Sequence, residues 1–248
     1  QWMAYAVDHI RSMNAADLAT CLYALAALGL EPEDWFVKAW IDAAPRRIPQ
    51  CTHVELANII YAVGALRIDP GPDVLDAWAE AILPVLKTLN SHALATTLLA
   101  LGDLGVCPSD EFAEAWQARA AQVMDTFTTD EFFNLVDAVE ALSLDRSFDF
   151  VDAWCVSGEQ RLPKLSVDRV GVLLDYFPKL SVEPAETFAQ SWFARVEQLL
   201  PAVDDEERQS LTEKVAAIDF EPPETYHLAL AASAAIEVST AEQPAEAP

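Results

Sequence analysis

Residues 112–116 read Phe-Ala-Glu-Ala-Trp, an aromatic residue followed four positions later by a tryptophan. Residues four positions apart lie on one face of an α-helix, so the stretch predicts a helix with an aromatic edge. The tryptophan belongs to a series with a period of 38 residues, and an apolar residue precedes each of the last five members by four positions. The two columns are Trp2, Trp40, Trp78, Trp116, Trp154 and Trp192, and Phe36, Val74, Phe112, Phe150 and Phe188.

Further columns share this period, which is typical of stacked supersecondary units that bury their apolar faces against their neighbours. One column is apolar and forms a helical stripe: Leu18, Leu56, Leu94, Phe132 and Val170. Another holds residues whose side chains can accept a hydrogen bond from the first turn of a helix. These predicted N-caps are Asn14, Thr52, Asn90, Thr128, Ser166 and Asp204. Each repeat is therefore predicted to be a helical hairpin, with helix A carrying the tryptophan and helix B carrying the stripe.

The predicted fold is all-α, an α-solenoid of about six 38-residue helix-turn-helix repeats with a degenerate C-terminal capping repeat. We expect a single repeat domain over residues 1–236, whose first repeat is incomplete, and an acidic, proline-containing tail over 237–248. The natural chain is expected to extend upstream of Gln1. Helix A is predicted at 33–45, 72–87, 110–124, 148–161, 185–200 and 223–236, and helix B at 15–28, 53–66, 91–104, 129–142, 167–180 and 205–218.

Composition and motifs argue against several classes of function. The four cysteines form no C-x-x-C pair, the four histidines show no H-E-x-x-H spacing, and no glycine-rich phosphate loop occurs. The sequence therefore predicts no catalytic residue, metal site or cofactor. It contains no apolar run of about 18 residues, which predicts that no segment spans a membrane. With 40 acidic and 15 basic residues, the net charge is −25.

The repeat resembles a known family. Its residues 31–35 read Glu-Pro-Glu-Asp-Trp, and its B helices contain Asp-Leu-Ala-Thr at 17–20 and Glu-Leu-Ala-Asn-Ile-Ile-Tyr-Ala at 55–62. A 38-residue hairpin of this kind resembles the octotricopeptide repeat of green-algal organelle proteins. The resemblance implies import into an organelle, with the mitochondrion preferred to the chloroplast, and a role either in binding organellar RNA or as a subunit of a large organellar assembly.

Two exposed columns are candidate binding surfaces. Two residues before the tryptophans, Asp76, Glu114 and Asp152 would align carboxylates on helix A, a ridge that attracts a basic protein and repels RNA. The alternative is that these acids only solvate the exterior. On helix B, short polar side chains able to contact base edges form a second column: Thr20, Asn58, Thr96 and Asn134.

The acidic balance favours a non-catalytic scaffold that binds other protein subunits with basic surfaces, as a structural subunit or assembly factor of an organellar complex such as an ATP synthase or ribosome. The alternative is an octotricopeptide-type RNA-binding protein in organellar RNA maturation or translation. RNA is disfavoured by charge, because phosphate contacts need Lys or Arg. Clustering of basic residues in one groove would favour RNA, and Arg46-Arg47 alone is too small a footprint.

Overall fold

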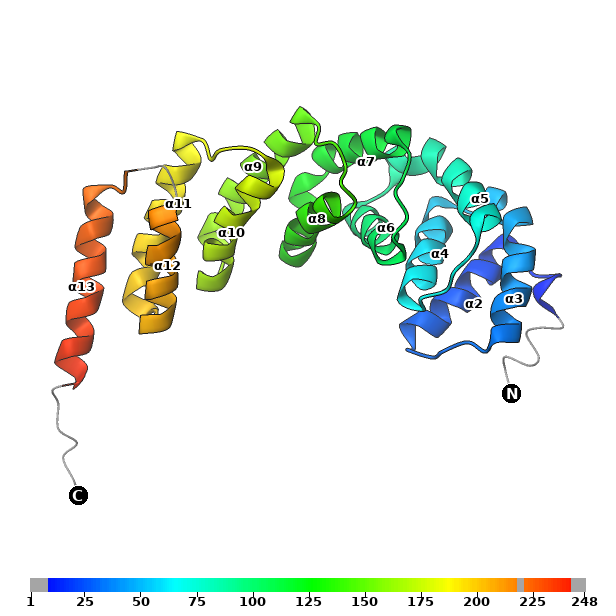
Figure 1. Ribbon diagram of the computed structural model, residues 1–248, viewed down its shortest axis with the longest axis horizontal. Coiled ribbons are helices and arrows are strands. Elements are labelled where there is room, and N and C mark those ends of the chain that lie inside the picture. The colour runs from blue at the N-terminus through cyan, green and yellow to red at the C-terminus, as the bar shows by residue number, and fades with distance from the viewer. Residues whose placement is uncertain (1–8, 218–220, 242–248) are drawn as a thin grey trace, which may run out of the picture. The chain divides into compact units, whose positions relative to one another are not determined.

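The computed structural model describes residues 9–217 and 221–241, which contain helices and no strand. This confirms the predicted all-α class. Twelve α-helices lie in the described part of the chain (Figure 1). Their bounds are α2 Ala15–Ala27, α3 Asp34–Ala43, α4 His53–Ala65, α5 Pro72–Ile82, α6 Ser91–Leu104, α7 Asp110–Gln122, α8 Thr129–Ala141, α9 Phe148–Arg161, α10 Val167–Leu180, α11 Glu186–Leu199, α12 Asp205–Ala217 and α13 Glu224–Ala241.

The helices recur at the period of the sequence. The even-numbered helices, α2 to α12, begin at intervals of 38 residues. The odd-numbered helices, α3 to α13, begin at the same interval. The even-numbered helices correspond to the predicted helix B and the odd-numbered ones to helix A. Polar side chains set their starting points: Asn14 Oδ1 accepts a hydrogen bond from Asp17 N at 2.8 Å, and Asn90 Oδ1 accepts one from Ala93 N at 2.9 Å.

The chain divides into two compact units, residues 1–153 and 154–248, and α9 spans the division. In the first unit α2, α4, α6 and α8 lie side by side in one layer (Figure 1). The odd-numbered helices form a second layer. There α5 packs against the 3-10 helices η1 Ala44–Arg46 and η2 Ile48–Gln50, and α7 packs against η3 Leu83–Thr88.

Tryptophans join the two layers of the first unit. The indole N–H of Trp40 donates to Leu18 O at 3.0 Å, and that of Trp116 donates to Leu94 O at 3.0 Å. Trp78 makes the equivalent bond at 2.9 Å to the carbonyl 22 residues before it. An indole N–H can only donate, so each buried ring needs such an acceptor. The bond fixes the depth and the rotation of helix A against the first turn of helix B.

The second unit repeats this connection. Trp192 is buried on α11, and its indole N–H donates to Val170 O of α10 at 2.9 Å. The rings of Phe177 and Phe188 meet edge to face, with centroids 4.7 Å apart, and join the same two helices. Helix α12 packs against α10, and α13 packs against α11. The hairpins of this unit therefore pack neighbour to neighbour, as those of the first unit do.

The A helices depart from the expected ranges at their C-terminal ends. Several of them end early and are followed by 3-10 turns, and five of these turns carry proline in their first two positions. Proline cannot donate the N–H that would continue an α-helix, so the chain tightens there. Helix α13 continues to Ala241, beyond residue 236. Trp2 and the part of the expected tail over 242–248 lie outside the described residues.

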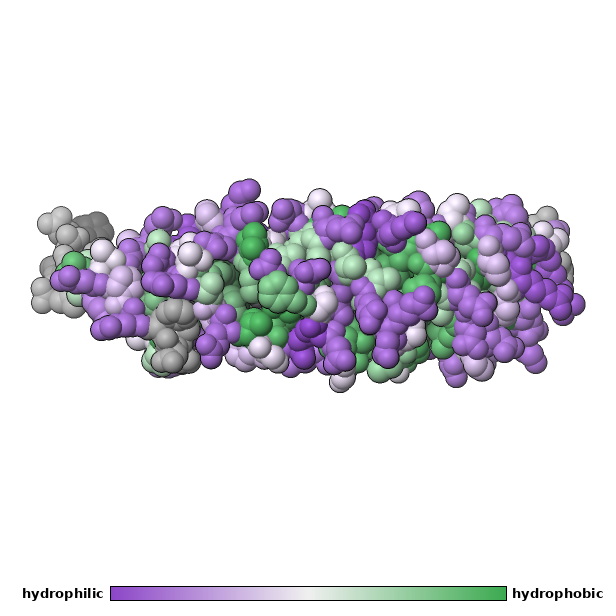
Figure 2. Space-filling model, turned by 90° about the horizontal axis from the view of Figure 1, so that it is seen from above, coloured by the Kyte–Doolittle hydropathy of each residue, from purple (hydrophilic) through white to green (hydrophobic). Residues whose placement is uncertain are grey.

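One face of the molecule can be followed in Figure 2. On the face seen in Figure 2, hydrophilic side chains predominate and hydrophobic ones show between them. None of the helices in the described part of the chain has the length and hydrophobicity that crossing a membrane requires.

Candidate functional site

A hollow of about 370 Å³ opens on the layer of even-numbered helices in the first unit. We call it the α2–α4–α6 hollow. No Asp, Glu, Lys or Arg lines it, although the chain carries a net charge of −25. The lining instead combines aromatic, amide, hydroxyl and imidazole groups. The lining residues are Tyr23, His53, Val54, Ala57, Asn58, Tyr61, Asn90, His92, Ala93 and Thr96.

The N-terminal halves of α4 and α6 provide most of this lining, and their caps hold them in register. Thr52 begins α4 with a capping box: its backbone N–H donates to Glu55 Oε2 at 2.7 Å, and its hydroxyl accepts from Glu55 N at 3.4 Å. Asn90 begins α6 one period later. Asn58 and Thr96, one period apart, consequently occupy the same place on two adjacent helices.

Two tyrosines form the aromatic part of the hollow. The ring centroids of Tyr23 on α2 and Tyr61 on α4 are 5.8 Å apart, with an angle of 50° between the planes. Tyr23 is 38% exposed, so part of its ring faces solvent. An exposed tyrosine ring can stack on a flat ligand such as a nucleobase, and such stacking is largely independent of charge.

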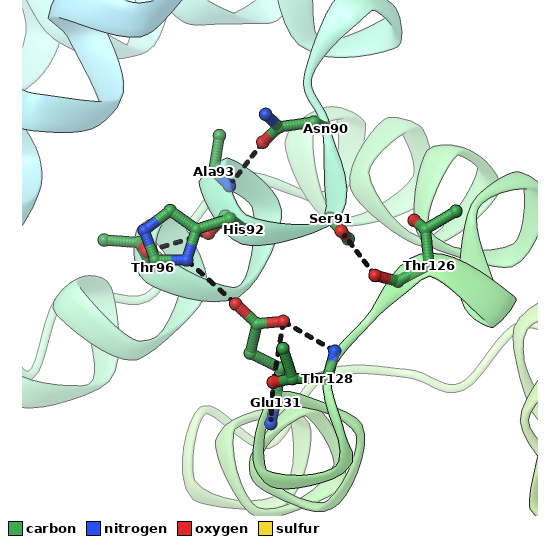
Figure 3. A network of polar contacts seen from close by, with 8 residues as sticks. All are labelled: Asn90, Ser91, His92, Ala93, Thr96, Thr126, Thr128 and Glu131. Carbon is green, nitrogen blue, oxygen red and sulfur yellow. Dashed lines mark hydrogen bonds and ion pairs between the residues drawn. The ribbon is translucent and has the colours of Figure 1, made fainter. Parts of the chain in front are cut away.

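A polar network connects the lining residue His92 to the start of α8 (Figure 3). Nδ1 of His92 on α6 lies 2.8 Å from Oε1 of Glu131 on α8. The second oxygen of Glu131 accepts a hydrogen bond from Thr128 N at 2.8 Å, which completes the capping box of α8. Nearby, the Ser91 hydroxyl donates to Thr126 O at 3.0 Å. Glu131 therefore caps its own helix and also holds a side chain of the hollow.

Electrostatics favour the charged form of this carboxylate. Burial works to raise the pKa of Glu131, but the hydrogen bonds from Thr128 and the contact with His92 outweigh burial and lower that pKa. A carboxylate can only accept, so Nδ1 of His92 carries the proton in this contact. The His92 side chain is 81% exposed, which leaves the rest of the ring open to solvent.

The structure brings together half of the column predicted to contact RNA bases. Asn58 and Thr96 line the hollow, while Thr20 on α2 and Asn134 on α8 are exposed outside it. The Thr96 hydroxyl donates to His92 O at 2.7 Å, so its oxygen remains able to accept. Asn58 makes no side-chain hydrogen bond to another described residue, so its amide is available to a ligand.

The predicted acidic ridge lies on the other layer. Asp76 on α5, Glu114 on α7 and Asp152 on α9 are all exposed, and none lines the α2–α4–α6 hollow. Each lies two residues before a buried tryptophan, which directs its side chain away from the core. The two candidate surfaces predicted from the sequence are therefore on different helices of the same unit.

The basic residues do not gather at the α2–α4–α6 hollow. The guanidinium of Arg119 donates to Leu89 O at 2.9 Å and is occupied within the fold. Arg11, Arg46 and Arg47 line a separate hollow. Clustering of basic residues, which would favour RNA binding, is thus found in part, because three arginines lie at one place.

Sequence reasoning assigned no role to the two tyrosines or the two histidines of the hollow. Tyr23 and Tyr61 are one period apart, which was a signal that they share a face of neighbouring B helices. In the described residues, no group of three or more metal-binding side chains comes together, and the four cysteines are free thiols. Burial raises the pKa of the Cys21 thiol to about 12, which makes it unreactive at neutral pH.

One comparison with known proteins matches more than half of this chain. The family model described as "Tbc2 translation factor, N-terminal domain" matches residues 2–146. The matched range contains the whole α2–α4–α6 hollow and the network of Figure 3. No curated protein matches the chain.

Proposed function

This chain belongs to the Tbc2 translation factor N-terminal domain family, and we propose that it acts in translation by holding unpaired RNA bases in the α2–α4–α6 hollow. In this proposal the chain is an α-solenoid of octotricopeptide type, working inside an organelle, as the resemblance of its repeats implies. It is non-catalytic: its part is to bind and position. The observation that carries the proposal is a hollow of aromatic and amide groups, with no Asp, Glu, Lys or Arg in its lining, within the range that matches a translation factor family.

The chemistry of the hollow supports bases rather than another ligand. Tyr23 and Tyr61 offer ring faces on which a base can stack. Asn58 offers both a donor and an acceptor, the pair of groups that matches the edge of a base. In double-stranded RNA the bases are stacked on one another and paired, so their faces cannot stack on a tyrosine. Single-stranded RNA, whose bases can unstack, is therefore the ligand we propose.

Binding of an unstructured oligoribonucleotide at physiological salt, followed by photo-crosslinking and peptide mapping, tests this proposal. We expect a submicromolar dissociation constant, which corresponds to a binding free energy of about 8 kcal/mol or more. Crosslinks should fall on the peptides that contain Tyr23 and Tyr61. No detectable binding, or crosslinks confined to the odd-numbered helices, would contradict the proposal.

The exposed carboxylates support a second candidate function. Asp76, Glu114 and Asp152 present negative charge on the layer opposite the hollow. A basic protein surface would be drawn to them, so the same chain could serve as a scaffold that docks another subunit. Salt-sensitive association with a lysine-rich peptide, lost when the three carboxylates are neutralised, would support this function. Association that the substitutions leave unchanged would reject it.

A further inference from the structure

Three arginines meet at the second hollow of the first unit, where the sequence alone offered only a pair. Arg46 and Arg47 follow α3, and the fold brings Arg11 beside them from the segment before α2. The hollow measures about 710 Å³. Its other two lining residues are Ala43 and one acidic residue, Asp42. Arg47 Nη2 donates to Arg11 O at 3.4 Å, which ties the two segments together. We call this place the arginine hollow.

Buried neighbours hold these arginines in place. Ile10, Ala44 and Ile48 are fully buried. They anchor the backbone next to each arginine, and the side chains of Arg11 and Arg46 project to the exposed side. In addition, the Gln50 amide donates to Arg46 O at 3.1 Å. A site anchored in this way loses little conformational freedom when a ligand binds.

The three guanidinium groups of the arginine hollow are not held in ion pairs with described residues. Among the described residues no carboxylate, Asp42 included, forms an ion pair with Arg11, Arg46 or Arg47. Only 15 of the 248 residues are Lys or Arg, so three at one place are a concentration of charge against the overall balance. Guanidinium groups bind phosphate oxygens in a two-pronged geometry that neutral side chains cannot match.

The repeat itself does not require arginine here. One and two periods later, the positions of Arg46 and Arg47 hold Pro84-Val85 and Gln122-Val123. Those hairpins fold with uncharged residues at the same place. Three periods later they hold Gln160-Arg161, so Arg47 has an arginine counterpart, whereas Arg46, and with it the pair, occurs in this repeat alone. A pair that the other hairpins do not need for packing is available for binding.

The arginines of this hollow are also close in sequence to residues of the proposed base-binding surface. Arg11 precedes Asn14, the N-cap of α2, and Arg47 precedes Thr52, the N-cap of α4. His53, the first residue of α4, already lines the α2–α4–α6 hollow. We propose that Arg11, Arg46 and Arg47 form a binding site for backbone phosphates of the single-stranded RNA whose bases occupy the α2–α4–α6 hollow. This inference rests on the proposed function and names the phosphodiester as the second group recognised.

The test measures the affinity for an oligouridylate as a function of salt. Replacing all three arginines with glutamine should weaken binding, and the slope of log affinity against log salt should become shallower by about 2, since each phosphate contact on a single strand contributes about 0.7. Because Arg47 also bonds to Arg11 O, the single variant Arg46→Gln serves as a second probe that removes no hydrogen bond of the fold. A matched variant removes the same charge at exposed positions of the same unit: Lys38→Gln, Arg67→Gln and Lys87→Gln.

An abasic oligomer with the same number of phosphates separates this inference from the proposed function. The arginine variant should weaken both oligomers, whereas Tyr23→Ala with Tyr61→Ala should weaken only the one that has bases. If the unaltered protein binds RNA but the arginine and control variants lose affinity equally, the phosphate site is wrong and the proposed function stands. If the unaltered protein binds no RNA, both fail. Equal binding of a glutamate-rich peptide would replace the phosphate assignment with a general acidic partner.

Discussion

The α2–α4–α6 hollow and the exposed face of α5 and α7 belong to the same compact unit but differ in their chemistry. The hollow has no Asp, Glu, Lys or Arg in its lining and contains two tyrosines in contact, whereas Asp76 and Glu114 expose carboxylates on the other layer. Both layers bury equivalent columns, and the same tryptophan hydrogen bond joins them in successive repeats. Buried positions therefore maintain the repeat, while exposed positions carry the difference in surface chemistry.

The largest expected effect on stability comes from removing a tryptophan that connects the two layers. Trp116→Ala removes a fully buried ring and the donor to Leu94 O. We expect the free energy of unfolding to fall by about 3–5 kcal/mol, the usual cost of such a cavity. Chemical denaturation measures it. Trp35→Ala is the control, because Trp35 is 37% exposed and should cost far less. Equal losses in the two variants would mean that burial does not explain the role of the tryptophan column.

The next effect is specific to the hollow. Tyr23→Ala together with Tyr61→Ala should reduce RNA affinity by about 1–3 kcal/mol for each base that stacks on a ring. Replacement by phenylalanine keeps the ring faces and should restore most of that affinity. Fluorescence titration with an oligouridylate provides the measurement. A phenylalanine variant as weak as the alanine variant would show that the hydroxyl groups, not stacking, bind the ligand.

A smaller effect concerns the edge of the hollow, at Glu131. Glu131→Gln should lower the free energy of unfolding by about 1 kcal/mol at neutral pH, since it weakens a capping box and the contact with His92. Glu55→Gln is the matched control, because Glu55 completes the same kind of box and no histidine contacts it in the described residues. The loss should therefore be larger at Glu131 than at Glu55. Equal losses would show that the His92 contact adds nothing.

The same carboxylate predicts a pH dependence. The pKa of Glu131 is lower in the folded protein than its ordinary value of 4.5. Its contribution to stability is therefore fully present above the unfolded-state pKa and is lost as the pH falls through the folded-state pKa. The difference in unfolding free energy between the unaltered protein and Glu131→Gln should shrink in that acidic range. A difference that stays constant below pH 4.5 would contradict the lowered pKa.

The smallest expected effect is on the other layer. Neutralising the three carboxylates should change the free energy of unfolding by no more than about 0.5 kcal/mol, because exposed charges of this kind contribute little. RNA affinity should rise slightly, since repulsion of phosphates decreases. A fall in RNA affinity would mean that RNA contacts this layer. The variant is Asp76→Asn, Glu114→Gln and Asp152→Asn, and the control with equal charge is Glu80→Gln, Asp103→Asn and Glu111→Gln.

The sequence by itself determined the elements and their spacing. The tryptophan period predicted helical hairpins, and the N-cap column predicted where the even-numbered helices begin, as at Asn14 and Asn90. These features depend on interactions within one or two turns of helix, which recur wherever the same residues recur. The sequence also indicated the polar column that contains Asn58 and Thr96, since its period places them on one face of adjacent helices.

Which exposed residues meet depends on how the helices pack. The 3-10 turns that follow the A helices place Arg46 and Arg47 beside Arg11, and the packing of α2 on α4 brings Tyr23 against Tyr61. Such neighbours are set by the register of the turns between helices and by buried contacts such as Trp40 to Leu18. The 38-residue period shows which residues share a face of neighbouring B helices, such as Tyr23 and Tyr61, but it does not show which residues from non-equivalent positions meet, such as Arg11 and Arg46. The repeat could therefore be predicted from the sequence, whereas the two hollows had to be found in the fold.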